Sequence, residues 1–335
     1  MKKYFSFILI LFIFLSVTNI LKVNGIIYNN FELNVGIFFD PKAREDIALD
    51  LNKIKNNGIK WLRIHFSWKE IEEEKGFYNF TLYDYIVNVS RELGLNILGI
   101  IGTGTEDYLP DWLKIKGGVD NENYINYLVI FAEKVIQRYK NDIKVWQLEN
   151  ELNHISFFKW MGWRKGNWSD LKVKEILLSL SNLTKKYNLS SVINVIVNNP
   201  NWLSFLKKLI EWNVNFEIIG IDYYPNYLDD YDIIPGDPNK GIKIYEEINK
   251  AKQFNKKIII TEVGYSTYNE KHSKENQAVF FEKVIIGSIL ANVTNIFIYR
   301  YDDNILSSDI EANFGLIDYF NNPKLAWYKI KELTS

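Results

Sequence analysis

The chain contains no cysteine among its 335 residues, which excludes disulfide bonds, thiol nucleophiles and thiolate metal sites. Histidine is nearly as scarce. His65, His154 and His272 are the only three, and they lie far apart in the sequence. A histidine-rich zinc site is therefore not expected. We predict a protein that needs neither a metal ion nor a cofactor.

An excess of charge of one sign is also missing. The 40 Lys and Arg residues nearly balance the 41 Asp and Glu residues, which leaves a formal net charge of -1. No basic face stands out, so a nucleic-acid partner is not expected. The composition leaves the oligomeric state open.

The first 25 residues form the one segment that stands apart from the rest. Two lysines precede an apolar run over residues 4–17, and polar residues follow. This is the layout of a signal peptide, with cleavage after Gly25. An uncleaved membrane anchor is the alternative, although the run is shorter than the roughly 20 residues that span a bilayer. Either way we expect a secreted or extracellular-surface protein, with residues 26–335 forming one catalytic domain.

From Leu33 onward, short apolar runs alternate with stretches of helical periodicity. This alternation predicts strand–helix units around a parallel sheet. The expected strands cover residues 33–39, 59–66, 95–102, 143–149, 191–197, 216–223, 257–262 and 295–301. The expected helices cover residues 41–57, 82–93, 122–139, 171–187, 202–212, 242–254, 274–292 and 324–331.

Eight such units, without a linker or a low-complexity tract, predict an α/β fold with a single (β/α)8 TIM barrel. Asp40 and Pro41 should open the first helix, because aspartate is a good N-cap and proline suits the first helical position. A doubly wound open sheet is the alternative. That fold should show a glycine-rich first turn, and here Gly36 stands alone.

Two glutamates stand at the ends of expected strands. Glu151 follows the strand over residues 143–149, directly after Asn150, and Glu262 ends the strand over residues 257–262. In a barrel of this kind the carboxyl ends of the strands meet at one rim. Two carboxyl groups across a sugar ring can serve as nucleophile and acid/base in glycoside hydrolysis. We therefore predict that Glu151 and Glu262 form a catalytic pair.

Several segments, in this order and spacing, resemble the large clan of retaining (β/α)8 glycosidases that includes families 5, 35, 39 and 42. Gln147–Glu151 is similar to the strand-four motif of the family 35 and 42 β-galactosidases. Thr261–Tyr265 is similar to the strand-seven motif of several members. Further similar segments follow the second, third and eighth strands, at residues 66–80, 109–112 and 314–324.

The resemblance implies a double displacement that cleaves β-glycosidic bonds in an oligo- or polysaccharide, with Glu262 as nucleophile and Glu151 as acid/base. The two carboxyl groups should then lie about 5–5.5 Å apart, against roughly 6.5–9.5 Å in an inverting enzyme. The charge of Glu262 and partial burial should raise the pKa of Glu151. By the same resemblance, Arg63 should reach toward Glu262, Asn150 should bind the sugar 2-hydroxyl, and Tyr224 should bind Glu262 or the sugar.

The chain departs from the clan's patterns at three places. Leu152 stands where family 5 cellulases have proline after Asn-Glu. Asp222-Tyr223-Tyr224 stands where many members have His-x-Tyr, and Tyr299 takes the place of the usual strand-eight tryptophan. The family and the sugar therefore stay open. Two alternatives also stay open: a non-catalytic carbohydrate-binding barrel, and a transglycosylase that builds surface glycans.

Aromatic residues in the expected strand-to-helix loops are the candidate binding surface for a carbohydrate. Their flat faces suit the apolar faces of sugar rings, although the same side chains would also serve to pack the loops onto the barrel. A histidine on the face of Arg63 is a further sugar-binding candidate, with polar filling of the barrel as its alternative. These candidates are His65, Trp112, Trp160, Trp163 and Tyr299.

Overall fold

The structure is a computed structural model that describes residues 32–41, 46–224, 236–303, 305–307 and 309–334. The expected signal segment, residues 1–25, lies outside the described residues. Within the described ranges, no helix has the length and apolar character needed to cross a membrane.

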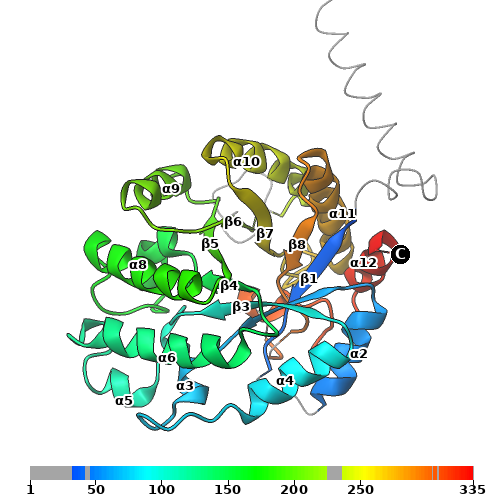
Figure 1. The fold of residues 1–335 in the computed structure, drawn as a ribbon. Coiled ribbons are helices and arrows are strands. Elements are labelled where there is room, and N and C mark those ends of the chain that lie inside the picture. The colour runs from blue at the N-terminus through cyan, green and yellow to red at the C-terminus, as the bar shows by residue number, and fades with distance from the viewer. Residues whose placement is uncertain (1–31, 42–45, 225–235, 304, 308, 335) are drawn as a thin grey trace, which may run out of the picture.

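Eight parallel strands close into a barrel in the order of the sequence (Figure 1). This arrangement confirms the predicted single (β/α)8 barrel. The strands are β1 (Asn34–Phe38), β2 (Trp61–His65), β3 (Asn96–Ile101), β4 (Val145–Leu148), β5 (Ser190–Ile196), β6 (Ile218–Tyr223), β7 (Lys257–Val263) and β8 (Asn295–Ile298).

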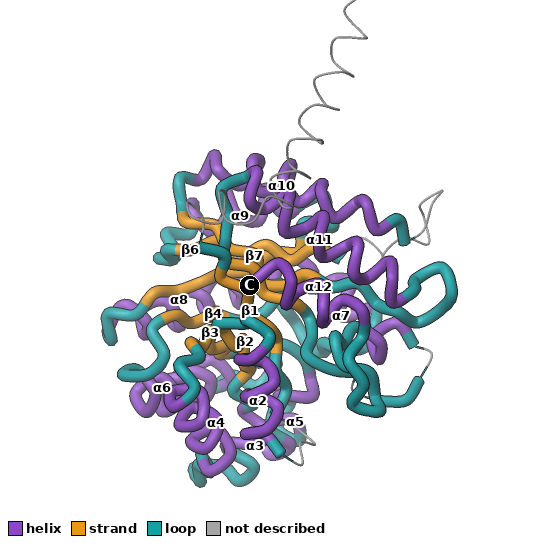
Figure 2. The backbone as a smooth tube through the Cα atoms, turned by 90° about the vertical axis from the view of Figure 1, so that its right-hand side faces the viewer, coloured by secondary structure: helices purple, strands orange, loops and turns teal. Residues whose placement is uncertain are grey.

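A ring of helices surrounds the strands, and each of these helices overlaps a predicted one. They are α2 (Ile47–Asn56), α4 (Thr81–Glu92), α6 (Tyr124–Tyr139), α8 (Asp170–Lys186), α9 (Trp202–Glu211), α10 (Ile244–Ala251), α11 (Lys274–Leu290) and α12 (Leu325–Thr334). Three short helices that were not predicted interrupt the loops after strands, namely α3 (Trp68–Ile71), α5 (Asp111–Lys114) and α7 (Ile155–Trp160). In the side view of Figure 2, α7 lies with long loops beyond one end of the strands.

The first helix begins later than predicted. Its N-cap is Asp46, whose side chain accepts a hydrogen bond from the Leu49 backbone N at 2.9 Å. Asp40 and Pro41 lie outside this helix. Aspartate is a good N-cap at either position, so local propensity alone could not decide between Asp40 and Asp46.

The last helix completes the ring of helices beside α11 and α2 (Figure 1). Asn57, which caps α2, donates through Nδ2 to the Trp327 carbonyl at 3.1 Å. Thr334 donates through its hydroxyl to the Asn57 carbonyl, also at 3.1 Å. These bonds tie the C-terminal helix to the first strand–helix unit.

The interior of the barrel has an apolar lower layer and a polar upper layer. The lower layer is a small apolar cluster with its own members: Leu98, Val192, Ile218, Ile259 and Phe297, with Trp61 and Val145 packed against it. Residues two positions further along a strand face the same side, one layer higher. These upper positions carry Arg63, Gln147, Asn194 and Thr261, all buried. The apolar layer therefore supports a polar layer directly beneath the rim.

Candidate active site

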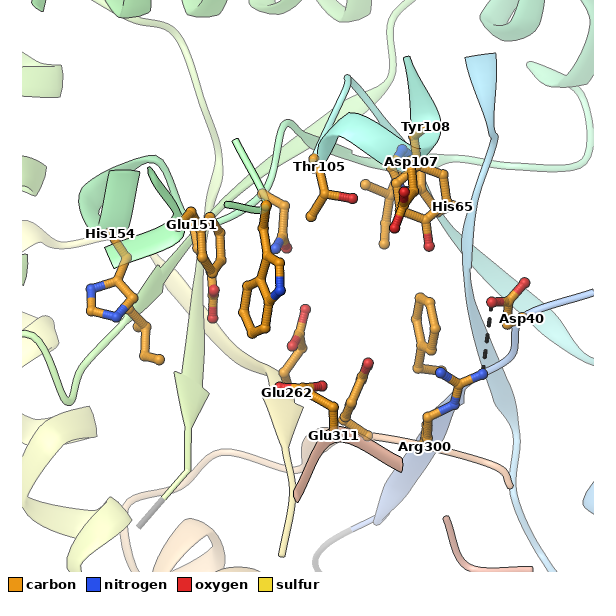
Figure 3. Close-up of a pocket in the computed structure, with 18 of the residues that line it drawn as sticks. Asp40, His65, Thr105, Asp107, Tyr108, Glu151, His154, Glu262, Arg300 and Glu311 are labelled. Atoms are coloured by element: carbon orange, nitrogen blue, oxygen red, sulfur yellow. Dashed lines mark ion pairs between the residues drawn. The ribbon is translucent and has the colours of Figure 1, made fainter. Parts of the chain in front are cut away.

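A pocket opens at the rim where the strands end, and residues from all eight strands or the loops that follow them line it (Figure 3). Glu151 and His154 stand at one end, and Asp40 with Arg300 at the other. Eight of the predicted site residues line this pocket: Arg63, His65, Asn150, Glu151, Trp163, Tyr224, Glu262 and Tyr299. Trp112 and Trp160 do not.

Glu151 and Glu262 meet in this pocket. Carboxylate oxygens of Glu151, Asp222 and Glu262 all lie within 4.8 Å of one another, and all three residues are buried. This short oxygen–oxygen separation is closer to the spacing of a retaining carboxyl pair than to the wider spacing of an inverting pair.

The Glu262 carboxylate is held in place by two donors. Arg63 Nη2 lies 2.6 Å from Glu262 Oε1, and the Tyr224 hydroxyl donates to Oε2. Gln147 Oε1 fixes the guanidinium by accepting from Arg63 Nε at 2.9 Å and from Nη2 at 2.7 Å. A nearby cation and a hydrogen-bond donor both favour a carboxylate over a carboxylic acid. Both oxygens of Glu262 are therefore held in fixed positions at the pocket.

Glu151 has the opposite electrostatic environment. Burial, followed by the nearby charges of Glu262 and Asp222, raises the pKa of Glu151 well above its ordinary value, and Arg164 opposes this shift. The backbone of Glu151 is left-handed, with φ at 46°. That conformation is uncommon for a residue other than glycine and turns the chain sharply after β4. A buried carboxyl that keeps its proton can act as a general acid.

Asn150 has its side-chain amide oriented by three donors. Its Oδ1 accepts from Arg63 Nη2 at 3.1 Å, from Gln147 Nε2 at 3.0 Å and from Asn194 Nδ2 at 2.8 Å. Its NH2 group donates to none of the described residues, and Asn150 lines the pocket. The arrangement leaves this NH2 group to bind a ligand.

Arg164 is a buried residue of the site that sequence reasoning missed. Its Nε donates to the Gly104 carbonyl at 2.6 Å, and its Nη2 donates to the Asn150 carbonyl at 2.5 Å. The guanidinium lies 4.9 Å from the ring centroids of both Phe158 and Trp168. It thereby fixes the loop that carries Glu151 to the loop that follows β3.

Glu149 supports the same region from below the rim. Its carboxylate accepts from the backbone N of Thr103 at 2.9 Å and of Gly104 at 3.1 Å. Like Glu151 it is left-handed, with φ at 61°. Glu149 therefore holds the β3 loop and does not line the pocket, although it lies only two residues from Glu151.

Gln147, Asn194 and Asp222 were also missed as site residues. They connect Arg63, Asn150 and Glu151 from inside the barrel. The sequence could have indicated them only because, like Arg63, they occupy the positions of their strands that face the barrel interior. Asp222 accepts from the Thr261 hydroxyl and from Asn194 Nδ2. Burial, and then the charge of Glu262, raises the pKa of Asp222 to about 8.

Trp112 and Trp160, two of the predicted sugar-binding residues, lie outside this pocket. Trp112 lies in α5, where its indole N donates to the Glu72 carbonyl at 3.0 Å and its ring meets Trp68 edge to face. Trp160 is 78% exposed on α7 and packs its ring against Phe157. A tryptophan in a long loop packs on its neighbours or faces solvent as readily as it faces a pocket.

Three other predicted binding residues lie where a ligand would meet them. Tyr299 lines the pocket with its ring 5.3 Å from that of Phe38. Trp163 lines it from the loop after β4. His65 lines it from β2, with Nε2 lying 3.0 Å from the Gly102 carbonyl O. That contact gives one ring nitrogen a structural role and fixes the orientation of the ring.

Glu151, Asp222 and Glu262 also have the separation of a metal-ligating trio. Donors already occupy several of these oxygens, since Arg63 and Tyr224 contact Glu262 while Thr261 and Asn194 contact Asp222. A positively charged guanidinium at 2.6 Å would repel a cation in the same place. The trio therefore has the surroundings of an acid–base cluster.

Comparisons with known proteins agree with this geometry. The sequence model of a glycoside hydrolase family described as beta-galactosidase matches residues 38–117. Endo-1,4-beta-xylanase B of Neocallimastix patriciarum is 25% identical over 162 residues, which is 46% of this chain and 18% of the relative. The chain thus spans less than a fifth of the length of that curated relative.

Solved structures share the fold at low sequence identity. An exo-beta-1,4-mannosidase from an Opitutaceae bacterium has a TM-score of 0.70 at 13% identity, over 90% of this chain and 59% of that one. A family 1 β-glucosidase from Thermotoga maritima has a TM-score of 0.68 at 16% identity, over 90% and 97%. A family 39 glycoside hydrolase from Bacteroides cellulosilyticus has a TM-score of 0.66 at 18% identity, over 91% and 64%. Together these findings confirm the resemblance to the (β/α)8 glycoside hydrolases.

Proposed function

We propose that this protein is a retaining glycoside hydrolase that cleaves β-glycosidic bonds of an oligo- or polysaccharide. The observation that carries the proposal is the pair of buried glutamates at one rim of the barrel, with carboxylate oxygens within 4.8 Å. One of them is paired with a guanidinium, and burial together with neighbouring carboxylates raises the pKa of the other. The relatives named above, a xylanase, a mannosidase and a glucosidase, support the same class of reaction.

In the first step, Glu262 attacks the anomeric carbon while Glu151 gives its proton to the glycosidic oxygen. The bond between sugar and leaving group breaks, and a covalent glycosyl–enzyme ester forms on Glu262. The NH2 group of Asn150 faces the pocket and is positioned to bind a sugar hydroxyl next to the reacting carbon. Such a hydrogen bond accelerates the step to the extent that it strengthens in the transition state.

In the second step, Glu151 accepts a proton from water, which attacks the same carbon and releases Glu262. The ester has no negative charge, so one of the two charges that raise the pKa of Glu151 is absent in the intermediate. Glu151 can then act as a base at the pH at which it first acted as an acid. Both steps use only side chains of this chain.

The position of Glu151 defines the two sides of the pocket. The leaving group should lie on the side of Glu151 and His154, where the His154 ring packs against Phe157 and Phe158. The sugar that forms the ester should lie toward Asp40 and Arg300 at the far end (Figure 3), where the Arg300 guanidinium lies 5.8 Å from the Tyr299 ring centroid. The apolar leaving-group side also favours a second candidate function, transfer of the glycosyl unit to an acceptor sugar instead of water.

Nucleophile removal tests the proposal. The wild type should hydrolyse at least one member of a panel of nitrophenyl β-glycosides and β-linked polysaccharides, and product analysis at high acceptor concentration should measure transfer. Glu262→Ala should abolish turnover, and azide should partly restore it by forming a glycosyl azide. Normal turnover by Glu262→Ala would contradict the assignment. Sugar binding without turnover in the wild type would favour a non-catalytic barrel.

We also propose that the protein acts outside the cytoplasm. This rests on the sequence layout of residues 1–25 alone. Expression of the full chain, followed by sequencing of the N-terminus of the protein recovered from the medium or the cell surface, tests it. Cleavage after Gly25 is the expected result, while recovery of the full chain from the cytoplasm would contradict the proposal.

A further inference from the structure

A third buried carboxyl contacts both proposed catalytic glutamates and has no part in the two steps above. Asp222, in β6, is 0% exposed. One oxygen of its carboxyl lies within 4.8 Å of an oxygen of Glu151 and of an oxygen of Glu262. A hydrogen bond between the Asp222 and Glu151 side chains is among the causes that raise the pKa of Glu151. A carboxyl–carboxyl hydrogen bond requires a proton on one of the two groups.

Two neutral donors hold Asp222 in place. The Thr261 hydroxyl donates to Oδ1 and Asn194 Nδ2 donates to Oδ2, both at 2.5 Å. Gly220 gives the Thr261 side chain its space, because a Cβ at residue 220 would lie only 2.5 Å from Thr261 Oγ1. The absence of a side chain at Gly220 thus leaves room for the Thr261 hydroxyl to donate to Asp222.

These donors decide on which of the two residues the shared proton resides. Hydrogen bonds to a carboxylate favour its charged form, and Asp222 accepts two of them. Glu151 Oε1 is buried and accepts no hydrogen bond from the described residues. The negative charge is therefore more stable on Asp222, and the last proton of the pair is more stable on Glu151.

We propose that Asp222 is a positioning residue that accepts a hydrogen bond from the Glu151 carboxyl and keeps the proton on Glu151 until the glycosidic oxygen takes it. The inference rests on the proposed function and deepens it. In the first step the proton passes from Glu151 to the leaving oxygen, and Asp222 neither gains nor loses one. In the second step the proton of water returns to Glu151, and Asp222 accepts its hydrogen bond again.

The charged groups around the pair agree with this assignment. Glu262 from β7 and Asp222 from β6 disfavour the ionised form of Glu151, whereas Arg164 from the loop after β4 favours it. Asp222 is affected by Glu262 and, in the opposite sense, by Arg63 of β2. Both members of the pair have a raised pKa, so the pair still holds a proton at neutral pH.

Asp222→Asn tests the inference through the pH dependence of kcat/KM. The variant removes a negative charge beside Glu151 but keeps the size of the side chain. The alkaline limb should move down by at least about one pH unit, while the acidic plateau stays within a few-fold of the wild type. If Asp222 had a purely structural role, the variant would lower kcat/KM equally at every pH. That result would contradict the proposal.

Two further variants frame that result. Thr261→Val removes one donor from Asp222, so the shared proton resides more often on Asp222 and less often on Glu151. The plateau of kcat/KM should therefore fall, while the alkaline limb should not move down as it does in Asp222→Asn. Asp50→Asn makes the same carboxyl-to-amide change at a buried residue of α2 that bonds to the Tyr301 hydroxyl. That control should leave the limb in place. A shift of equal size in the control would contradict the proposal.

A direct titration separates this inference from the proposed function. The side-chain carboxyl signal of Glu151 is followed by carbon-13 NMR of glutamate-labelled protein and is identified by its loss in Glu151→Gln. Its midpoint should lie well above that of the exposed glutamates in the wild type and should fall in Asp222→Asn, whether or not any glycoside is hydrolysed. An unchanged midpoint in Asp222→Asn would overturn the inference while leaving the turnover test of Glu262→Ala to decide the function.

Discussion

At the scale of single residues, Arg63 is the side chain that joins most of the site. Its guanidinium contacts Glu262, Gln147 and Asn150 from one buried position. The planar fork of arginine makes several directed hydrogen bonds at once, which the single ammonium group of lysine cannot do. Arg63 therefore orients both the proposed nucleophile, Glu262, and the side chain of Asn150.

Arg63→Lys should lower kcat/KM on an aryl β-glycoside by roughly 100-fold, the size expected when a charge-stabilising donor is lost from an active site. Arg138→Lys is the matched control, because Arg138 makes an exposed pair with Asp84 far from the pocket. Steady-state kinetics checks both variants. A fall of less than about threefold in Arg63→Lys would mean that the pair with Glu262 has no part in the rate-limiting chemistry.

The sequence predicted the position of a residue correctly where a motif and the inward-facing positions of a strand pointed to the same residue. It left other residues of the site unplaced. Glu151, Glu262 and Arg63 were placed at one rim because each ends a strand or faces into the barrel. Arg164 could not be placed, because it lies in a loop whose path depends on Phe158 and Trp168. For the same reason, the sequence could not show which aromatic residues of the loops face the pocket, as Trp112 and Trp160 illustrate.

At the scale of elements, the loops after β3 and β4 behave as one unit. Glu149 accepts hydrogen bonds from the backbone of the β3 loop, while Arg164 donates to carbonyl groups in both loops. Arg164 Nη2 also lies 3.8 Å from Glu149 Oε2. The position of Glu151 at the rim therefore depends on a buried ion pair within the loop after β4, and both members of that pair also hydrogen-bond to the loop after β3.

Arg164→Met should destabilise the protein by about 3–5 kcal/mol, because it leaves Glu149 as a buried charge without its cation. Urea unfolding at neutral pH measures this change. Arg91→Met, at an exposed pair with Asp142, is the control and should change the stability by less than about 1 kcal/mol. If both variants lose the same small amount, the buried pair does not hold the loops.

Eight strand–helix units could be predicted because each strand is a short apolar run and each helix has its own period. The short helices α3, α5 and α7 could not, since four to six residues are too few to show a helical period. The predicted start of α2 was wrong because it rested on N-cap propensity alone. Both Asp40 and Asp46 offer an N-cap, and only the packing of the helix on the barrel selects the second.

At the scale of the whole molecule, the barrel interior is organised by size as well as by polarity. Gly36 on β1 lies beside Phe297 on β8, its register partner. A Cβ at Gly36 would lie 2.3 Å from Phe297 Cδ1 and 3.0 Å from Trp61 Cβ. The missing side chain on one strand thus makes room for a large ring on the next.

Gly36→Ala should therefore cost about 1–3 kcal/mol of stability, the usual range for overpacking a filled core. Phe297→Leu should also lower the stability, but it creates space at the same place. The double variant should therefore lose less stability than the sum of the losses in the two single variants. Thermal and urea unfolding of the four proteins form the cycle. Additive effects would show that the ring and the glycine do not constrain each other.

The raised pKa of Glu151 should also appear in the pH dependence of folding stability. The folded protein keeps this proton at a pH at which the unfolded chain, with a glutamate pKa of about 4.3, has lost it. This contribution is complete below the unfolded pKa and is lost as the pH rises toward the folded value. Glu151→Gln removes the titration, so its melting temperature relative to the wild type should increase between pH 4 and pH 8. A constant difference across that range would contradict the shift.

The three donors on Asn150 Oδ1 also bear on how a preparation of this protein ages. Asparagine is among the thermolabile residues, since its amide is lost by slow hydrolysis and leaves aspartate. A carboxylate at residue 150 would still accept from Arg63, Gln147 and Asn194, so the fold would survive the change. The NH2 group that faces the pocket would be gone. Stored protein would then keep its melting temperature while losing activity. Isoelectric focusing would show the fraction with aspartate at residue 150 as a more acidic band.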